Sequence, residues 1–227
     1  MRIQWFGQSA FLLTNDEKAI FIDPFGNMDP LVQRGLRWEY PGIENVGSDV
    51  LLVTHDHLDH NAVDLIGGLP QTIQSSAGTF ETPLGTVTGI ASEHDEAAGT
   101  LRGANVIYRF EFAELRVCHF GDFGQSMLRP EQRTAIGEID LLFIPVGGMA
   151  TINGEFAARI VDEFRPRWVV PMHYRTPAIS FLEPADSFLE AVRDFRIERL
   201  ASPDFETAVL PSGDAPTIVV PTPPAAN

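Results

Sequence analysis

Basic residues are scarce in this sequence. Its 227 residues include 16 Lys and Arg against 31 Asp and Glu, which gives a formal net charge of -15. Proteins that bind nucleic acids through phosphate contacts need a basic stripe, and anionic membrane surfaces attract the same kind of patch. The basic residues here are scattered along the chain. We therefore expect no nucleic acid and no membrane among its partners, and a small molecule as substrate.

Cysteine and long apolar runs are also scarce. The one cysteine, Cys118, cannot form an internal disulfide, which fits a reducing compartment, and we expect it to be a small buried residue. No stretch approaches the roughly 18 apolar residues of a membrane-spanning helix, and residues 1–7 lack the pattern of a signal peptide. These absences predict a cytoplasmic protein, and they leave a homo-oligomer open.

Short apolar segments bounded by Gly, Pro, Asn or Asp predict β-strands throughout the first half of the chain. They cover residues 3–6, 10–14, 19–22, 50–54, 86–91, 105–112 and 115–120. Between two of them, residues 24–49 form a connection longer than structureless loops usually are. Its aromatic and cationic residues either face a ligand or pack the connector itself, and the sequence does not decide between these roles.

The second half of the chain shows a different pattern. Strands predicted at 141–146 and 168–172 alternate with helical periodicity at 156–164 and 188–195, which is typical of α/β packing. We predict one α/β domain over residues 1–227. Residues 212–227 are rich in proline and small side chains, and we expect them to form a partly disordered tail.

One short segment is dense in potential metal ligands. After the predicted strand 50–54 come His55, Asp56, His57, Leu58, Asp59 and His60. His55 and His57 alternate along the chain and can point to one side, while Asp59 and His60 can serve a second point. Imidazole and carboxylate ligands suit Zn, Mn or Fe, and this arrangement suits two ions.

The other histidines follow the same rule of position. His94 follows the predicted strand 86–91, Asp122 follows 115–120, and His173 follows 168–172. A single histidine near a strand end is usually structural. Five of the six histidines come directly after apolar strands, however, and this regularity favours a shared metal site.

The ordered ligand set resembles that of the metallo-β-lactamase fold hydrolases. Segments 119–124 (HFGDFG), 144–148 (IPVGG) and 171–174 (PMHY) are similar to an uncharacterised metal-dependent hydrolase branch, which also resembles ascorbate-phosphate lactonases and the N-acyl phosphatidylethanolamine phospholipase D. The resemblance implies an αββα four-layer sandwich, with two mixed sheets and helices on the outer faces. Position 57 is His and not Glu, which favours hydrolysis over the di-iron oxygen-reducing branch.

The resemblance also implies roles for individual residues. His55, His57 and His94 would hold the first of two divalent metal ions, Asp59, His60 and His173 the second, and Asp122 would bridge them. The ions would be Zn, with Mn or Fe as alternatives. Asp23 is either the buried carboxylate that orients a ligand histidine or a turn cap before Pro24.

Further residues are candidates for catalysis and substrate binding. We predict Asp59 and His119 as catalytic residues, because strand alternation could bring His119 close to the metals. Candidate substrate contacts are Arg102, Gly148, Tyr174 and Arg175. The favoured function is cleavage of a small lactone or phosphodiester by a metal-bound hydroxide. The alternatives are an iron-dependent oxidoreductase or dioxygenase and a non-catalytic metal-binding protein.

Overall fold

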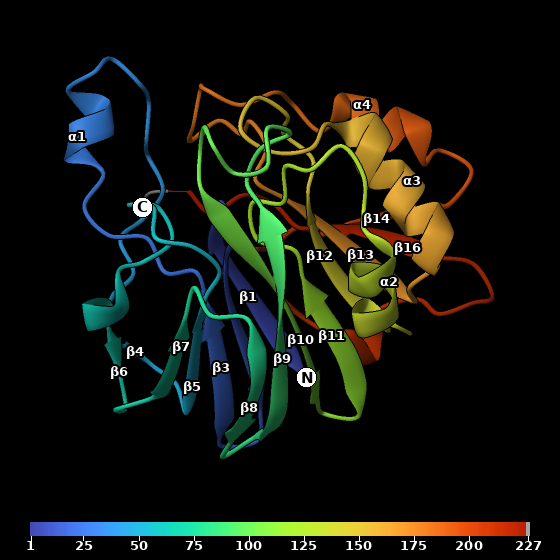
Figure 1. Cartoon of the computed structure of the whole chain (residues 1–227), viewed down its shortest axis with the longest axis horizontal. Coiled ribbons are helices and arrows are strands. Elements are labelled where there is room, and N and C mark those ends of the chain that lie inside the picture. The colour runs from blue at the N-terminus through green and yellow to red at the C-terminus, as the bar shows by residue number, and fades with distance from the viewer. Residues whose placement is uncertain (226–227) are drawn as a thin grey trace.

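The computed structural model describes residues 1–225 and arranges them mainly as two mixed β-sheets packed face to face (Figure 1). The six-stranded sheet has the order β15 (Asp204–Glu206), β1 (Arg2–Gly7), β2 (Ala10–Asn15), β3 (Lys18–Ile22), β5 (Val50–Val53) and β7 (Gln71–Gln74). The eight-stranded sheet has the order β14 (Arg196–Arg199), β16 (Thr217–Val220), β13 (Trp168–Met172), β12 (Leu141–Pro145), β11 (Leu115–His119), β10 (Ala104–Phe112), β9 (Gly85–Glu93) and β8 (Gly78–Thr82). A short pair, β4 (Val46–Gly47) and β6 (Ile66–Gly67), stands apart.

The continuous apolar runs form strands that are buried on both faces. In β5, Val50 and Leu52 belong to the core between the sheets, whereas Leu51 and Val53 belong to a second core on the outer face. Side chains of a strand alternate between the two faces, so a strand without polar alternation must be covered on both. The sheet therefore needs an outer layer as well as its partner sheet.

Helices cover the outer face of the eight-stranded sheet. Helices α2 (Pro130–Ile136), α3 (Gly154–Phe164) and α4 (Asp186–Ala191) lie together on this side (Figure 1). In α3 the side chain of Asn153 accepts a hydrogen bond from the backbone N–H of Phe156, which caps the helix start, and Ile160 and Val161 are buried. No helix in residues 1–225 is long and apolar enough to cross a membrane.

The outer face of the six-stranded sheet is covered mostly by an aromatic loop. Helix α1 (Asp29–Val32) and the 3₁₀ helix η1 (Val63–Leu65) lie on this side but bury no residue. The cover comes from Phe25, Trp38 and Tyr40, which pack with Ile179 and its neighbours. The connection at residues 24–49 is thus a packed layer. The predicted αββα fold is confirmed, with a thinner helical layer on this sheet.

The expectation of a partly disordered tail from residue 212 is wrong for Thr217–Val220. These residues form β16, which is fully buried and pairs in parallel with both β13 and β14. The short apolar run supplies a strand inside the sheet, and this long-range pairing outweighs the proline-rich composition around it. A further 3₁₀ helix, η2 (Thr207–Val209), precedes the strand, and residues 226–227 lie outside the described residues.

Truncation of the chain tests the place of β16. Burial of an aliphatic side chain contributes about 1.5–3 kcal/mol, so losing Ile218, Val219 and Val220 removes about 5–9 kcal/mol, comparable with the whole stability of a domain. A chain that stops after Pro211 should therefore be unfolded or insoluble. The matched control, a chain that stops after Pro224, should keep its thermal midpoint. Equal midpoints for both chains would show that β16 is not part of the folded sheet.

Candidate metal centre

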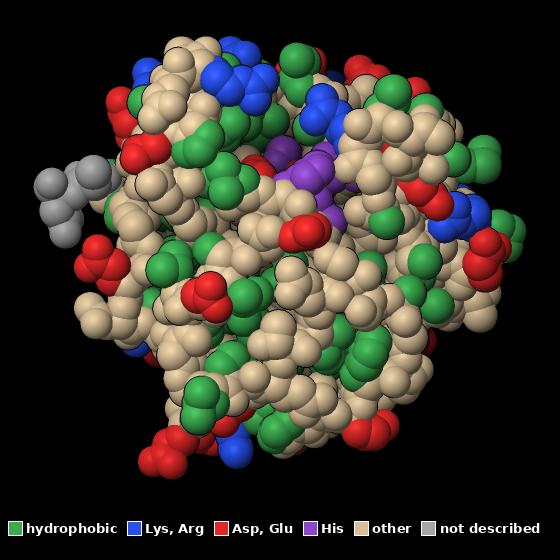
Figure 2. Space-filling model, turned by 60° about the vertical axis from the view of Figure 1, so that its left-hand side comes forward, with side chains coloured by type: hydrophobic (Ala, Val, Ile, Leu, Met, Phe, Trp, Pro, Cys, Tyr) green, Lys and Arg blue, Asp and Glu red, His purple; other side chains and the backbone are tan. Residues whose placement is uncertain are grey.

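The carboxyl ends of several strands meet at one end of the sandwich. Strands β9 and β11 both pair antiparallel with β10, and β11, β12 and β13 pair in parallel, so β9, β11 and β13 run in one direction. Strand β5 of the other sheet ends at Val53, shortly before His55. Figure 2 shows histidine side chains gathered in a hollow of the surface.

The structure brings all seven predicted ligands into one cluster. It forms three overlapping groups whose ligand atoms lie within 4.8 Å of one another: His55, His57 and His94; His55, His60 and Asp122; and Asp59, His60 and His173. The first and third groups contain the same residues as the two ligand triads that the family resemblance implies. The middle group joins them.

Asp122 lies at the centre of this cluster. Its Oδ2 atom is 3.1 Å from Nε2 of His94, 3.1 Å from Nε2 of His173 and 3.4 Å from Nε2 of His60. Nε2 of His55 is 3.9 Å away. One carboxylate oxygen thus faces histidines from both triads, as a bridging ligand must.

A tight turn places this carboxylate. Gly121 has a left-handed φ of 55°, and a Cβ atom there would lie 2.4 Å from Oδ1 of Asn105 and 2.7 Å from the Thr54 side chain. Asn105 also accepts a hydrogen bond from the backbone N–H of Asp122 at 3.0 Å. A glycine is required because no side chain fits between β10 and the end of β5.

Asp23 orients one of the ligand histidines. It is fully buried, its Oδ2 lies 2.9 Å from Nδ1 of His60, and it accepts hydrogen bonds from both the backbone N–H and the hydroxyl of Thr54. A carboxylate on one ring nitrogen fixes the ring so that the other nitrogen can bind a metal. Of the two roles considered for Asp23, the structure supports the orienting one.

The electrostatics of the cluster put His55 and Asp122 in the protonation states that bind metals. Burial and the neighbouring His60 ring lower the pKa of His55, so its imidazole is neutral. Burial alone would raise the pKa of Asp122, but His173 and His60 hold it well below its usual value. Neutral imidazole and ionised carboxylate are the forms that coordinate metals. Burial opposes the charged forms of His60 and His94, but neighbouring carboxylates, Asp122 above all, raise the pKa of both rings, so metal binding there would release protons.

The donor set fits a transition metal. Nε2 of His60 is buried and has no hydrogen-bond partner among the described residues, although Asp23 holds the other nitrogen of that ring. Leaving such an atom without a partner is costly, and a metal ion would satisfy it. Nitrogen and carboxylate donors together suit Zn, Mn or Fe.

The catalytic role predicted for His119 is wrong. Its Nε2 lies 3.1 Å from the backbone oxygen of Ser9, and its Nδ1 accepts a hydrogen bond from the backbone N–H of Gly121. The ring is fully buried, and burial lowers its pKa. Because both nitrogens bind backbone groups, His119 holds the turn before Asp122 in place and cannot exchange protons with a substrate.

Gln8 is a contact of the cluster that the sequence did not suggest. It lies in the turn between β1 and β2 and donates a hydrogen bond from Nε2 to Oδ2 of Asp59 at 3.2 Å. This oxygen also lies 3.7 Å from Nε2 of His60, so Gln8 holds the partly exposed Asp59 through the oxygen that faces the cluster. A polar residue between two strands is an ordinary turn signal, so nothing in the local pattern marks Gln8.

Two of the four predicted substrate contacts lie beside the cluster. Arg102 and Gly148 line a cavity of about 940 Å³ that also includes His94. Tyr174 and Arg175 line a separate cavity and do not contact this one. The Tyr174 ring packs 5.8 Å from the ring of Trp5, and Nε of Arg175 donates to the backbone oxygen of Leu182, so neither residue lines the cavity beside His94, and substrate contact by either one stays a prediction.

Comparisons with known proteins agree on one family. The family model described as a β-lactamase superfamily domain matches residues 2–173. A UPF0173 protein of Pyrococcus abyssi is 33% identical over 78% of this chain and 84% of its own length. A UPF0173 metal-dependent hydrolase of Pyrobaculum islandicum is 30% identical over 87% of this chain and 95% of its own length.

A solved structure shows the same architecture. A Thermotoga maritima protein, described as a Zn-dependent hydrolase of the metallo-β-lactamase superfamily, is 31% identical. It superimposes with a TM-score of 0.73 over 97% of this chain and 98% of its own. The chain therefore belongs to the metallo-β-lactamase fold superfamily.

Proposed function

We propose that this chain is a hydrolase that uses two divalent metal ions, with Zn as the first choice, to cleave a small lactone or phosphodiester. The observation that carries the proposal is the pair of ligand triads joined by Asp122. The relatives from Pyrobaculum islandicum and Thermotoga maritima, which are named as metal-dependent or Zn-dependent hydrolases, support the reaction class.

Each proposed ion has its own set of ligands. His55, His57 and His94 would hold one ion, Asp59, His60 and His173 the other, and Asp122 would contact both. When bound, divalent ions supply a hydroxide nucleophile near neutral pH and polarise a carbonyl or phosphoryl oxygen. The chain itself then needs no nucleophilic side chain. Cys118 fits this conclusion, because it is fully buried and burial raises the pKa of its thiol.

Asp59 is the residue best placed to carry a proton during the reaction. It is the one partly exposed carboxylate of the cluster, whereas Asp122 is buried. The hydrogen bond from Gln8 leaves its second oxygen free of the hydrogen bonds found in residues 1–225. A proton released at the site can therefore reach solvent through Asp59 more directly than through Asp122.

The charge of the protein limits the size of the substrate. A net charge of -15 repels polyanions, so a phosphodiester substrate would be small and would not be a nucleic acid. A cavity of about 940 Å³ beside His94 matches the volume of small-molecule sites.

A comparison of two aspartates, Asp122 and Asp56, tests the assignment of Asp122 as a metal ligand. Asp122→Ala should lower kcat/KM by more than about 100-fold and reduce the bound metal, because orienting contacts alone are already worth 10–100-fold. Asp56→Ala is the control: Asp56 is exposed, and within residues 1–225 its side chain accepts a hydrogen bond from Asn61 alone, so activity should stay within about twofold. Similar losses in both folded, metal-loaded variants would refute the assignment.

A substrate panel tests the reaction class. We expect the protein loaded with Zn or Mn to hydrolyse a chromogenic phosphodiester or a lactone and to leave a chromogenic cephalosporin largely intact. Initial rates on the three substrate classes, with the chelated protein as a blank, give the answer. Efficient cephalosporin cleavage, or no ester cleavage with both ion sites filled, would contradict the proposal.

A further inference from the structure

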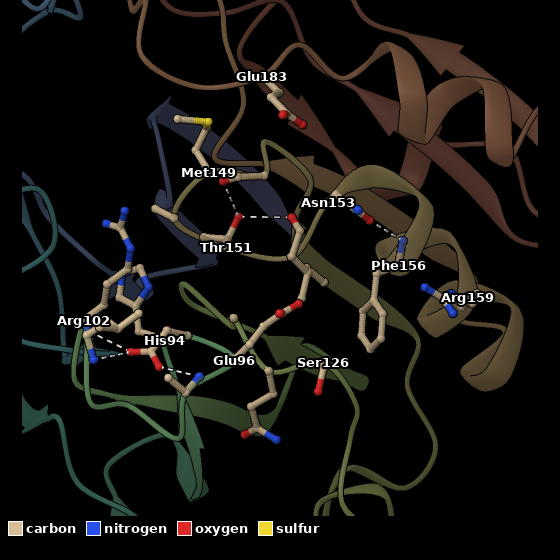
Figure 3. Close-up of a pocket in the computed structure, with 18 residues that line it drawn as sticks. His94, Glu96, Arg102, Ser126, Met149, Thr151, Asn153, Phe156, Arg159 and Glu183 are labelled. Carbon is tan, nitrogen blue, oxygen red and sulfur yellow. Dashed lines mark hydrogen bonds between the residues drawn. The ribbon is translucent and has the colours of Figure 1, made fainter.

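The cavity beside the metal cluster is elongated, and only one of its ends reaches the cluster. Figure 3 shows His94, Arg102 and Met149 at one end and Phe156 with Arg159 at the other. His94 belongs to the ligand cluster and also lines this cavity, so the cavity adjoins the cluster and can receive part of a molecule that reacts there. In that case the side chains at the His94 end would contact the part of the substrate next to the reacting bond.

Leu101 is held with its apolar side chain in solvent. It lines the cavity and is 79% exposed. Its loop is fixed by Asp95, whose carboxylate accepts hydrogen bonds from the backbone N–H groups of Ala97, Gly99, Leu101 and Arg102 at 2.7–3.1 Å. Asp95 directly follows His94 in the sequence, so the loop that presents Leu101 is tied to a ligand of the cluster.

Met149 is presented in the same way from another loop. It lines the cavity, is 70% exposed and has a left-handed φ of 55°. That conformation is unfavourable for a methionine, and it persists because the turn is fixed by hydrogen bonds from the backbone N–H of Thr151 to Gly148 and from Ile152 to Phe123. Two loops fixed by hydrogen bonds thus hold apolar side chains in solvent beside His94, where an apolar group of a ligand could bury them.

The charged residues of the cavity favour neither an anionic nor a cationic substrate. Asp95 is fully engaged by the backbone of its own loop. The remaining charged side chains are Glu96 and Glu183 against Arg102 and Arg159. Two carboxylates and two guanidinium groups balance, so net charge does not select the substrate's side group, and the exposed apolar side chains can do so.

We propose that Leu101 and Met149 bind an apolar acyl or alkyl chain of the substrate beside His94. The inference rests on the proposed function, because it treats this cavity as the substrate site. It names the substrate class more closely: a lactone or ester that carries an aliphatic chain, in preference to a small polar ester.

Methionine methyl NMR tests binding without any need for turnover. With ¹³C-methyl methionine, N-methyloctanamide, an uncleaved analogue of an octanoyl ester, should shift the Met149 resonance, and N-methylacetamide should not. Met127 is an internal control, since it is 64% exposed but does not line the cavity. Leu101→Asn should weaken the binding of N-methyloctanamide at least fivefold. A shift of Met127 equal to that of Met149, or no shift at all, would overturn the proposal.

Ester hydrolysis gives the second test. The octanoate ester of nitrophenol should be cleaved with a kcat/KM at least about tenfold higher than the acetate ester, and Met149→Asn should reduce this preference to below about threefold. Asparagine tolerates the left-handed conformation, so this variant should fold normally. Leu69→Asn is the matched control, because Leu69 is 99% exposed, has a φ of 54° and lies outside the cavity.

The two tests separate the inference from the function on which it rests. A selective Met149 shift without hydrolysis of any ester would support the apolar binding site and contradict the proposed hydrolase function. Hydrolysis that does not depend on chain length, with no Met149 shift, would leave the hydrolase standing and overturn the apolar site.

Discussion

The buried carboxylate of Asp122 is the constraint on which the rest of the site depends. Its Oδ2 atom faces imidazoles that come from both sheets. A charge taken out of water is unfavourable by several kcal/mol unless partners compensate it, so the strand ends of both sheets must meet around this one oxygen. Gly121, Asn105 and Thr54 set the turn that makes the approach possible. The packing of the two sheets therefore determines the geometry of the site.

The ligand set could be predicted from the sequence because strand ends carry positional information. The apolar run at residues 50–53 and the HDHLDH segment after it are local patterns, and a strand places alternate side chains by geometry alone. His94, Asp122 and His173 each follow a strand whose direction in the sheet puts it at the same edge. Local periodicity and the rule that strand ends converge predict that these residues lie together, whereas their division into two triads around Asp122 came from the family resemblance.

The features that the sequence did not predict concern contacts between distant segments. The alternation of side chains along β11 predicts which face His119 lies on. It does not predict that the backbone oxygen of Ser9 forms a hydrogen bond with one nitrogen of His119. His173 has a left-handed φ of 50°, so the chain turns directly after the ligand, and Arg175 belongs to another cavity. Strand β16 is recognisable only once its partners β13 and β14 are known. The aromatic cover at residues 24–49 likewise depends on the distant Ile179.

The central claim is that two triads share Asp122 and hold two ions. Crystals of the protein grown with excess Zn and measured at the zinc absorption edge test it most directly, because anomalous difference density locates each ion independently of activity. Two peaks are expected: one among His55, His57 and His94, the other among Asp59, His60 and His173, both next to Asp122. A single fully occupied peak at saturating Zn, or zinc bound away from Asp122, would contradict the account.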